Sequence, residues 1–371
     1  MVCQALNVQC SSDPKKYLGL PSMVGRKRKL AFQRINGWSI RHISQGGREV
    51  FIKAVLQAIP TYSMTCFLLP KLLCLEMENI MNSFWWNKTN GKRGMHWCDW
   101  KSLSASKEEG GLGFRDLSFF NTALLAKQGE ILLGVRFLKI QLVDGKGLLL
   151  KGLGWRVGDG QKISIWEDRW VPGNEMLNCQ NSSQNSSLVK VVELIDNNTR
   201  RWNEELILRT FAVRDAKRIL CIPLSMRSHE DFFIWREEAT EEYSVRSGHR
   251  VLAQGGHTQI QDSLKKFYKK LWSLDLPSKI KITAWLSMCN YLPNFSNLHY
   301  RRIMGPVNCK RCQAEIETRE HLFRNCHVAK ETWERLEMGW YVSEETEFTE
   351  WVKGVFENNS LLVCRRFVCA L

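Results

Sequence analysis

Four residues near the C-terminal end have the side chains and the spacing of a metal site. Cys309 and Cys312 form a C-x2-C pair, His321 follows nine positions later, and Cys326 lies five positions beyond it. Thiolate sulfur and imidazole nitrogen are good ligands for Zn2+, and two residues between the cysteines let a tight turn direct both sulfurs at one ion. The pattern C-x2-C-x8-H-x4-C therefore predicts one zinc ion. A shell filled by four protein ligands predicts a structural site and not a catalytic one.

Two features of this cluster leave other interpretations open. A C-x-x-C pair can be a redox site, but such a pair normally belongs to a βαβ unit, and no βαβ pattern surrounds Cys309. His327 competes with His321 as the third ligand. Five positions along an α-helix rotate by about 500°, so His321 and Cys326 cannot lie on one face of a straight helix. We therefore expect a turn or a helix end between them.

The charged residues around the cluster are balanced in sign. Residues 303–340 contain six basic and six acidic side chains. Three arginines surround the ligands and three glutamates lie between them, namely Arg311, Arg319, Arg324, Glu315, Glu317 and Glu320. A surface that attracts phosphate needs an excess of positive charge. This block is therefore not expected to bind phosphate by itself.

Basic residues gather in two other segments. The chain has 53 Lys and Arg against 38 Asp and Glu, a net charge of +15, and residues 14–71 contribute +10 and residues 261–302 contribute +6. Concentrated positive charge favours a polyanion, because each neutralised phosphate releases condensed counterions. A solvated basic surface is the alternative. The candidate contacts to RNA or DNA, which include one tyrosine able to stack on a base, are Arg26, Lys27, Arg28, Lys29, Lys265, Lys266, Lys269, Lys270, Tyr300, Arg301 and Arg302.

The composition is that of a globular protein. A chain of 371 residues with 44% hydrophobic side chains predicts two or three domains with a buried core. Thirteen cysteines are too few for a disulfide scaffold, and no apolar run follows a basic start. We therefore expect a reducing compartment and no secretory signal. No run of eighteen or more apolar residues occurs, so no membrane span is expected.

Helical spacing dominates the first 128 residues. Gly46-Gly47 precede a predicted helix that ends at Pro60, and Pro70 begins the next helix. Glu78 is expected to lie off the apolar face of that second helix, and residues 121–128 also show helical spacing. The apolar faces of the two helices are predicted to contain Phe51, Ala54, Val55 and Ala58 in the first and Leu73, Met77, Ile80, Met81 and Phe84 in the second.

The later elements are shorter. Residues 162–171 alternate in polarity and predict a strand, whereas residues 174–187 are rich in Asn, Ser and Gln and predict a linker. A hairpin is predicted between residues 232–234 and 243–245, with Ser247 as the cap of the next helix. Further helices are predicted around residues 264–271, 282–289, 294–298 and 329–336. The predicted fold class is mainly α with a few short strands, α+β, in which a helical connection precedes a small zinc-binding helical domain.

Several longer stretches resemble the C-terminal half of plant non-LTR retrotransposon polyproteins of the long-interspersed-element type. The stretches are Tyr17-Leu18-Gly19-Leu20-Pro21, SQGGREVFIKAVLQAIP from Ser44 to Pro60, Phe84-Trp85-Trp86, EGGLGFR from Glu109 to Arg115, Ile165-Trp166-Glu167-Asp168, and PSKIK from Pro277 to Lys281. The cluster from Cys309 to Cys326 resembles the reverse-transcriptase zinc-binding domain of that family. The resemblance covers residues 15 to 340.

The resemblance implies an order of parts. Proteins of this family run from an endonuclease through a polymerase palm, a thumb-like connection and the zinc-binding domain, often to a ribonuclease H domain. This chain is expected to begin after the palm and to stop before the ribonuclease H. The implied parts are a poorly ordered start at 1–13, a helical thumb-like region at 14–128, an irregular connection with the polar linker at 129–188, the zinc-binding domain at 189–340, and a weakly patterned tail at 341–371. The stretch 129–152 departs from the family, since it is shorter and rich in glycine.

The residues that polymerisation requires are missing from this sequence. Phosphoryl transfer by two Mg2+ ions needs paired carboxylates. The family holds them in a Tyr-x-Asp-Asp turn, whereas this sequence contains no Asp-Asp pair. A ribonuclease H site needs several converging acids. The tail offers acids only within one short segment, typical of a solvated acidic face, and these are Glu344, Glu345, Glu347 and Glu350.

We therefore expect a non-catalytic, zinc-binding and nucleic-acid-binding remnant of a retroelement reverse transcriptase. Its expected partners are RNA or DNA and, beside them, a complete reverse transcriptase. No membrane partner is expected. The alternative is a zinc-stabilised protein-interaction module or an inert, pseudogene-like fragment. Salt-dependent binding to RNA distinguishes the first interpretation from the second.

Overall fold

The computed structural model describes most of the chain. The described residues are 16–17, 20–21, 43–87, 94–133, 152–173, 188–196, 199–225, 227, 229–254, 262–305, 307–338 and 347–371. The predicted start at 1–13, the basic run 26–29 and the polar linker 174–187 lie outside them. Of the stretch 129–152, only residues 129–133 and 152 are described.

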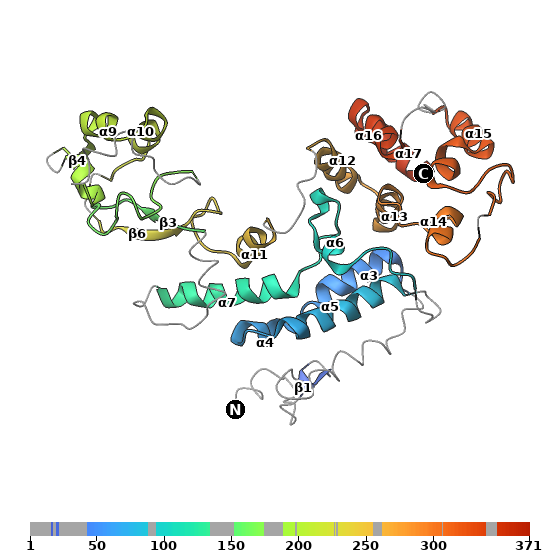
Figure 1. The fold of residues 1–371 in the computed structure, drawn as a ribbon, viewed down its shortest axis with the longest axis horizontal. Helices are drawn as coiled ribbons and strands as arrows, with labels where there is room; N and C mark the ends of the chain where they lie inside the picture. Colours follow the sequence, from blue (N-terminus) through green and yellow to red (C-terminus); the bar gives the residue numbers. More distant parts are fainter. Residues whose placement is uncertain are drawn as a thin grey trace, which may run out of the picture. The chain divides into compact units, whose positions relative to one another are not determined.

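The chain forms two compact units. The first unit contains residues 1–121 and 256–371, and the second contains residues 122–255. Helices predominate in the described parts of both units (Figure 1). The strands have two to four residues. The predicted fold class, mainly α with a few short strands, is confirmed.

The first unit begins with a short hairpin of β1 (Lys16–Tyr17) and β2 (Leu20–Pro21), and its helices start at α3 (Gln45–Phe51). The hydroxyl of Ser44 accepts a hydrogen bond from the Gly47 N–H and caps α3. Gly46 and Gly47 therefore lie inside the helix, and not before it as expected. A Cβ atom at Gly46 would lie 3.0 Å from the Ser278 Cβ atom, so glycine allows a close helix approach there.

A π-helix, η2 (Ile52–Leu56), continues α3 and changes the buried face. The predicted α-helical face fails for this reason, because Ile52 and Leu56 are buried while Ala54 and Ala58 are exposed. The wider turn of a π-helix shifts every later side chain around the axis. The helix α4 (Thr61–Cys66) follows after Pro60.

Pro70 begins α5 (Lys71–Trp86), as predicted. Met77, Met81 and Phe84 are buried, but so is Glu78, which is 5% exposed. The Glu78 carboxylate accepts a hydrogen bond of 2.7 Å from the Leu117 N–H. The expectation that Glu78 lies off the apolar face is therefore wrong, because this carboxylate caps the first residue of the next long helix.

That long helix, α7 (Leu117–Leu133), begins in the first unit and ends in the second. It confirms the helix predicted at 121–128 and extends it at both ends. Before it, α6 (Trp100–Ser104) and the 3-10 helix η3 (Lys107–Glu109) lead into the Gly110–Gly113 turn. Gly110 has a φ of +81°, a conformation that favours glycine.

The second unit contains a two-stranded antiparallel ribbon of β3 (Leu153–Arg156) and β6 (Phe232–Trp235) (Figure 1). The Trp155 and Phe233 rings pack on each other across the ribbon, with centroids 3.9 Å apart. The predicted hairpin between 232–234 and 243–245 is wrong, since β6 pairs with a strand almost eighty residues earlier. Residue Val245 begins α11 (Val245–Gln254) instead.

Residues 162–171 form no named strand, although Ile163 and Ile165 are buried as the alternation suggested. Ser164 makes a single bridge to Lys190. The carboxylate of Asp231 accepts hydrogen bonds from the Gly158, Gly160 and Lys162 N–H groups at 2.7, 2.9 and 2.9 Å and fixes this loop. The remaining elements of the unit are η4 (Val191–Leu194), β4 (Ile195–Asp196), β5 (Arg201–Trp202), α9 (Glu204–Thr210) and α10 (Val213–Leu220).

Ser247 does not cap α11 as predicted. The Ser244 hydroxyl accepts a hydrogen bond of 3.0 Å from the Ser247 N–H, so the cap lies three residues earlier. The Ser247 hydroxyl is buried and accepts a hydrogen bond of 2.9 Å from the Trp235 indole N–H. It therefore links α11 to the β3–β6 ribbon.

The first unit resumes with α12 (Asp262–Ser273), α13 (Ser278–Met288) and α14 (Phe295–Tyr300). α12 packs on η3, and α13 packs on α3. The indole N–H groups of Trp272 and Trp285 donate to the carbonyls of Lys107 and Gly110 at 3.1 and 2.7 Å. Segments that lie more than 150 residues apart in the sequence thus form one core.

The chain then forms η5 (His321–Asn325), α15 (His327–Arg335), α16 (Phe348–Asn358) and α17 (Leu361–Ala370). We expected a weakly patterned tail after residue 340, but residues 348–370 form two helices. Rings from the last three helices pack together, with centroid distances of 5.9 Å for Trp333–Trp351, 5.1 Å for Trp333–Phe367 and 5.2 Å for Trp351–Phe367.

None of the helices in the described ranges is long and apolar enough to cross a bilayer.

Candidate metal centre

The structure brings Cys309, Cys312, His321 and Cys326 together. Their ligand atoms all lie within 4.8 Å of one another, one from each side chain. A tetrahedral zinc ion with Zn–S bonds of about 2.3 Å has sulfur–sulfur edges of about 3.8 Å. Three sulfurs and one nitrogen at these separations therefore fit one zinc ion after a small contraction.

The first two cysteines lie on a tight turn. The Gln313 N–H donates to the Cys309 carbonyl and the Cys309 N–H donates to the Glu315 carbonyl, both at 2.7 Å. Asn308 and Ile316 form a bridge at the base of this turn. The turn folds the chain back on itself, so that both sulfurs face the same point, as the C-x2-C spacing predicts.

The π-helix η5 brings His321 and Cys326 together, although five positions along an α-helix would place them on different faces. The Cys326 N–H donates to the His321 carbonyl at 2.9 Å, which is the i→i+5 bond of a π-turn. A π-turn brings the fifth residue close to the face of the first, which an α-helix does not. The helix then restarts, with Cys326 at the N-cap position of α15. His321 belongs to the cluster, whereas His327 is exposed.

Burial and hydrogen bonds act on the sulfurs in opposite directions. Cys309 and Cys326 are fully buried, and Ala329 packs against them. Burial raises the pKa of the Cys326 thiol. Backbone N–H groups, with that of Ala314 first, lower the pKa of the Cys312 thiol to about 6, since they stabilise the thiolate. One sulfur is therefore prepared for the anionic state that metal binding requires.

The His321 ring has a defined contact at each nitrogen. Its Nε2 atom lies 3.1 Å from the Cys312 Sγ atom, on the side of the cluster. Its Nδ1 atom lies 2.9 Å from a carboxylate oxygen of Glu315, on the opposite side of the ring. Nε2 is thus the nitrogen available to a metal ion.

Two of the three arginines around the ligands, Arg319 and Arg324, contact neighbouring helices. Arg319 donates to the carbonyls of Ser287 and Met288 at the end of α13, at 3.3 and 3.0 Å, and its guanidinium lies 4.5 Å from the Phe348 ring centroid. The guanidinium of Arg324 lies 5.8 Å from the Trp351 ring centroid. Both arginines therefore join the cluster segment to the neighbouring helices and do not form a phosphate site.

The candidate nucleic-acid residues that the structure describes have different surroundings. The Lys270 ammonium donates to the carbonyls of Phe356 and Asn359, at the end of α16. Lys266 and Lys269 are exposed on α12, and Lys265 is half-buried. Lys270 is thus occupied by a helix end, while the exposed lysines remain available to a ligand.

Aromatic and basic side chains alternate around α14. Tyr300 is 86% exposed. The Arg301 guanidinium lies 5.6 Å from the Trp97 ring centroid and donates to the Trp97 carbonyl at 3.1 Å. The Lys310 ammonium, on the cysteine turn, lies 5.4 Å from the Phe295 ring centroid. We call Tyr300, Arg301, Arg302 and Lys310 the α14 surface.

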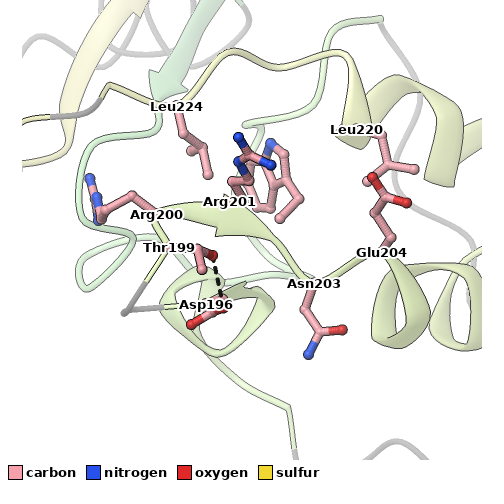
Figure 2. A pocket seen from close by; sticks show the side chains of 9 residues that line it. Asp196, Thr199, Arg200, Arg201, Asn203, Glu204, Leu220 and Leu224 are labelled. Carbon is pink, nitrogen blue, oxygen red and sulfur yellow. Dashed lines mark hydrogen bonds between the residues drawn. The ribbon is translucent and has the colours of Figure 1, made fainter.

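The second unit contains a pocket of about 620 Å3 beside the β4–β5 hairpin (Figure 2). Its polar groups make hydrogen bonds within the hairpin and at the start of the next helix. Thr199 donates to Asp196 at 2.8 Å, the Trp202 indole donates to the Ile222 carbonyl at 2.8 Å, and Asn203 caps α9. Two arginines and two acids face the pocket, so it has no excess charge for an anion or a cation. These charged residues are Arg200, Arg201, Asp196 and Glu204.

Sequence reasoning missed two features of the metal centre. Glu315 was treated as one of several charges, although the short spacing after Cys312 could have suggested a contact. The helices that pack beside the cluster were missed because the tail was thought to lack a pattern. Yet apolar residues at i, i+3, i+4, i+7 and i+8 mark α16, at Phe348, Trp351, Val352, Val355 and Phe356.

Comparison with known proteins supports this reading. Residues 243–333 match the model of a family described as zinc-binding in reverse transcriptase. The chain is 26% identical over 337 residues to an Arabidopsis thaliana protein provisionally named a ribonuclease H protein, covering 82% of this chain and 54% of the relative. The chain thus spans about half the length of that relative.

A second relative is an uncharacterised mitochondrial protein of Arabidopsis thaliana. It is 38% identical over 143 residues, which cover 31% of this chain and 93% of the relative. The matched family segment contains all four residues of the cluster. This chain therefore belongs to one family with the mitochondrial protein and carries the zinc-binding domain of reverse transcriptases, in agreement with the resemblance to plant retrotransposon reverse transcriptases.

Proposed function

We propose that the chain is a zinc-stabilised, nucleic-acid-binding module without catalytic activity of its own. The observation that carries the proposal is the convergence of three sulfurs and one imidazole nitrogen within 4.8 Å. The ligands proposed for one Zn2+ are Cys309, Cys312, His321 and Cys326. The ion would crosslink the cysteine turn to the start of α15, which is the work of a structural zinc site.

Metal analysis of the purified full chain tests the zinc site. We expect one zinc ion per chain, and Cys312→Ser should lower this content sharply. Cys289→Ser is the matched control, because Cys289 is a half-buried thiol 3.6 Å from the Tyr268 hydroxyl and outside the cluster. A well-folded wild-type protein without zinc, or a Cys312→Ser protein with full zinc content, would remove the site.

The distribution of charge supports nucleic acid as the ligand of the first unit. Residues 122–255 contain 19 basic and 17 acidic side chains, so the first unit holds +13 of the net +15. The exposed Lys266 and Lys269 and the α14 surface belong to this unit. Phosphates would contact the cations and an unpaired base would stack on Tyr300, which gives affinity with little sequence preference.

Binding to single-stranded RNA at several salt concentrations tests this part. We expect a steep fall of affinity with salt, and Lys266→Gln with Lys269→Gln should reduce the slope by up to about 1.4, since each phosphate contact contributes roughly 0.7 on single strands. The control removes two charges from the second unit through Arg209→Gln and Lys217→Gln. Equal slopes in all three proteins would show that α12 makes no contact.

The third part of the proposal is the lack of catalysis. One relative is provisionally named a ribonuclease H protein, but this chain spans only about half of that relative. The support is the sequence, which has no Asp-Asp pair to hold two Mg2+ ions. Primer extension and RNA–DNA hybrid cleavage with Mg2+ or Mn2+ are expected to give no product. Activity that copurifies with the chain through several columns would overturn this part.

A further inference from the structure

One residue that is not in the proposed ligand set contacts three of its members. The Glu315 carbonyl accepts a hydrogen bond of 2.7 Å from the Cys309 N–H. The Glu315 N–H donates to the Cys312 sulfur, where it helps to lower the pKa of that thiol. The Glu315 carboxylate accepts from His321 Nδ1 at 2.9 Å. Two of these contacts use the backbone, and only the third depends on the side chain.

The side-chain contact selects one form of the histidine. A carboxylate can only accept a hydrogen bond, so the proton of a neutral His321 ring is held on Nδ1. The Nε2 atom then carries the free lone pair, and this atom lies on the side of the Cys312 sulfur. Without the carboxylate, the two tautomers would compete and the ring could rotate about its χ angles.

We propose that Glu315 is a positioning residue that fixes the tautomer and the orientation of His321 and thereby raises the affinity of the cluster for zinc. This inference rests on the proposed zinc site. Carboxylate partners of ligand histidines typically change metal affinity by about 10- to 100-fold, because they orient the ring and increase its basicity.

The other nearby glutamates are engaged elsewhere. Glu317 accepts from the Phe295 N–H at 3.3 Å, and Glu320 pairs with Arg319 at 2.9 Å. The Glu315 side chain is 70% exposed while that of His321 is 6% exposed, so the carboxylate reaches a buried ring from the surface. Removing the Glu315 side chain therefore leaves no cavity, and its effect on zinc can be separated from an effect on folding.

The test measures the zinc dissociation constant of the full chain by competition with a chromophoric chelator. Glu315→Ala is expected to weaken zinc binding by about 10- to 100-fold. Glu315→Gln keeps an oxygen that accepts the Nδ1 proton and should recover part of the loss. The matched control is Glu334→Ala, an exposed glutamate on α15, which should bind zinc like the wild type.

Nitrogen–proton correlation spectra of the histidine rings provide the second readout. In the zinc-loaded wild type, His321 should carry its proton on Nδ1, and exchange of that proton with water should be faster in Glu315→Ala. A Glu315→Ala protein with wild-type affinity, or a Glu315→Gln protein as weak as Glu315→Ala, would overturn the inference. A wild type that binds no zinc would instead refute the underlying site, so the two failures are distinguishable.

Discussion

The first unit gathers three cysteines and a histidine around one point, whereas the second unit is fixed by a buried carboxylate and by paired aromatic rings. Asp231 holds three backbone N–H groups of one loop, and Trp155 packs on Phe233. The cluster lies in the first unit. Within the residues that the structure describes, these four side chains are the metal-ligand group that was found. The stability of the first unit should depend on a metal ion, and that of the second should not.

The two units also differ in charge. The second unit is nearly neutral, with 19 basic and 17 acidic side chains, while the first holds almost all of the excess. Charged residues of the second unit are paired at its surface, as in Arg209–Glu205 at 2.7 Å. We therefore expect metal dependence and attraction for polyanions to occur together in the first unit.

The largest expected effect separates the units by metal removal. Chelation of zinc should destabilise the first unit by about 4 kcal/mol relative to zinc at roughly 1,000 times its Kd, because folding of small zinc sites is coupled to binding. Hydrogen exchange should accelerate in residues 307–338 and stay unchanged in residues 231–236. Equal acceleration in both segments would contradict the division, and readdition of zinc is the control for irreversible damage.

The converse change acts on the second unit. Asp231→Ala leaves three N–H groups in a largely buried loop without their acceptor, and each such group costs about 1–3 kcal/mol. We expect a loss of about 3 kcal/mol or more in the unfolding of this unit, measured by urea titration with exchange protection of residues 157–163. The zinc content should remain that of the wild type. If it fell, the two units would not be independent.

A third change tests whether the two segments of the first unit form one core. A larger side chain at Gly46 meets the Ser278 Cβ atom and the Lys279 backbone, so Gly46→Val should cost about 1–3 kcal/mol by overpacking. Thermal unfolding of the first unit should occur earlier, with the second unit unaffected. Gly354→Ala in α16 is the control: nothing lies within 4 Å of its Cβ position, and we expect a small gain in stability.

The smallest effect concerns pH. Burial, the main cause, and the nearby Asp116 raise the pKa of Glu78 to about 7. The folded state therefore keeps this proton, and its contribution to stability is present below the ordinary value of 4.5 and lost as pH rises through 7. Glu78→Gln resembles the protonated form and should exceed the wild type by on the order of 1 kcal/mol at pH 8 and approach it at pH 4. Denaturant titrations at both pH values measure this, with the exposed Glu76→Gln as control.

Local signals in the sequence predicted much of the first unit. Pro70 begins α5, the helix predicted around residues 294–298 forms as α14, and the four candidate ligands converge. Each of these depends on residues close together in the chain, such as a proline at a helix start or a C-x2-C turn. The fold class followed from the same helical periodicities.

The failures were of a different kind. β6 pairs with β3 and not with its neighbour in the sequence, since strand pairing is decided by packing between distant segments. Glu78 is buried because the start of α7 needs an acceptor, and no local pattern shows this need. The burial of Ile52 and Leu56 followed a π-turn that the α-helical period could not predict.

The π-turn at residues 321–325 has a consequence for how the length of this segment can vary. With its i→i+5 bond it holds His321 and Cys326 near one face, although they lie five positions apart in the sequence. An ordinary α-helix brings residues four apart onto one face. Deleting one residue between the two ligands would exchange one type of turn for the other and preserve their proximity. Related chains with a spacer shorter by one residue can therefore keep the site, and a search that demands a fixed spacer would overlook them.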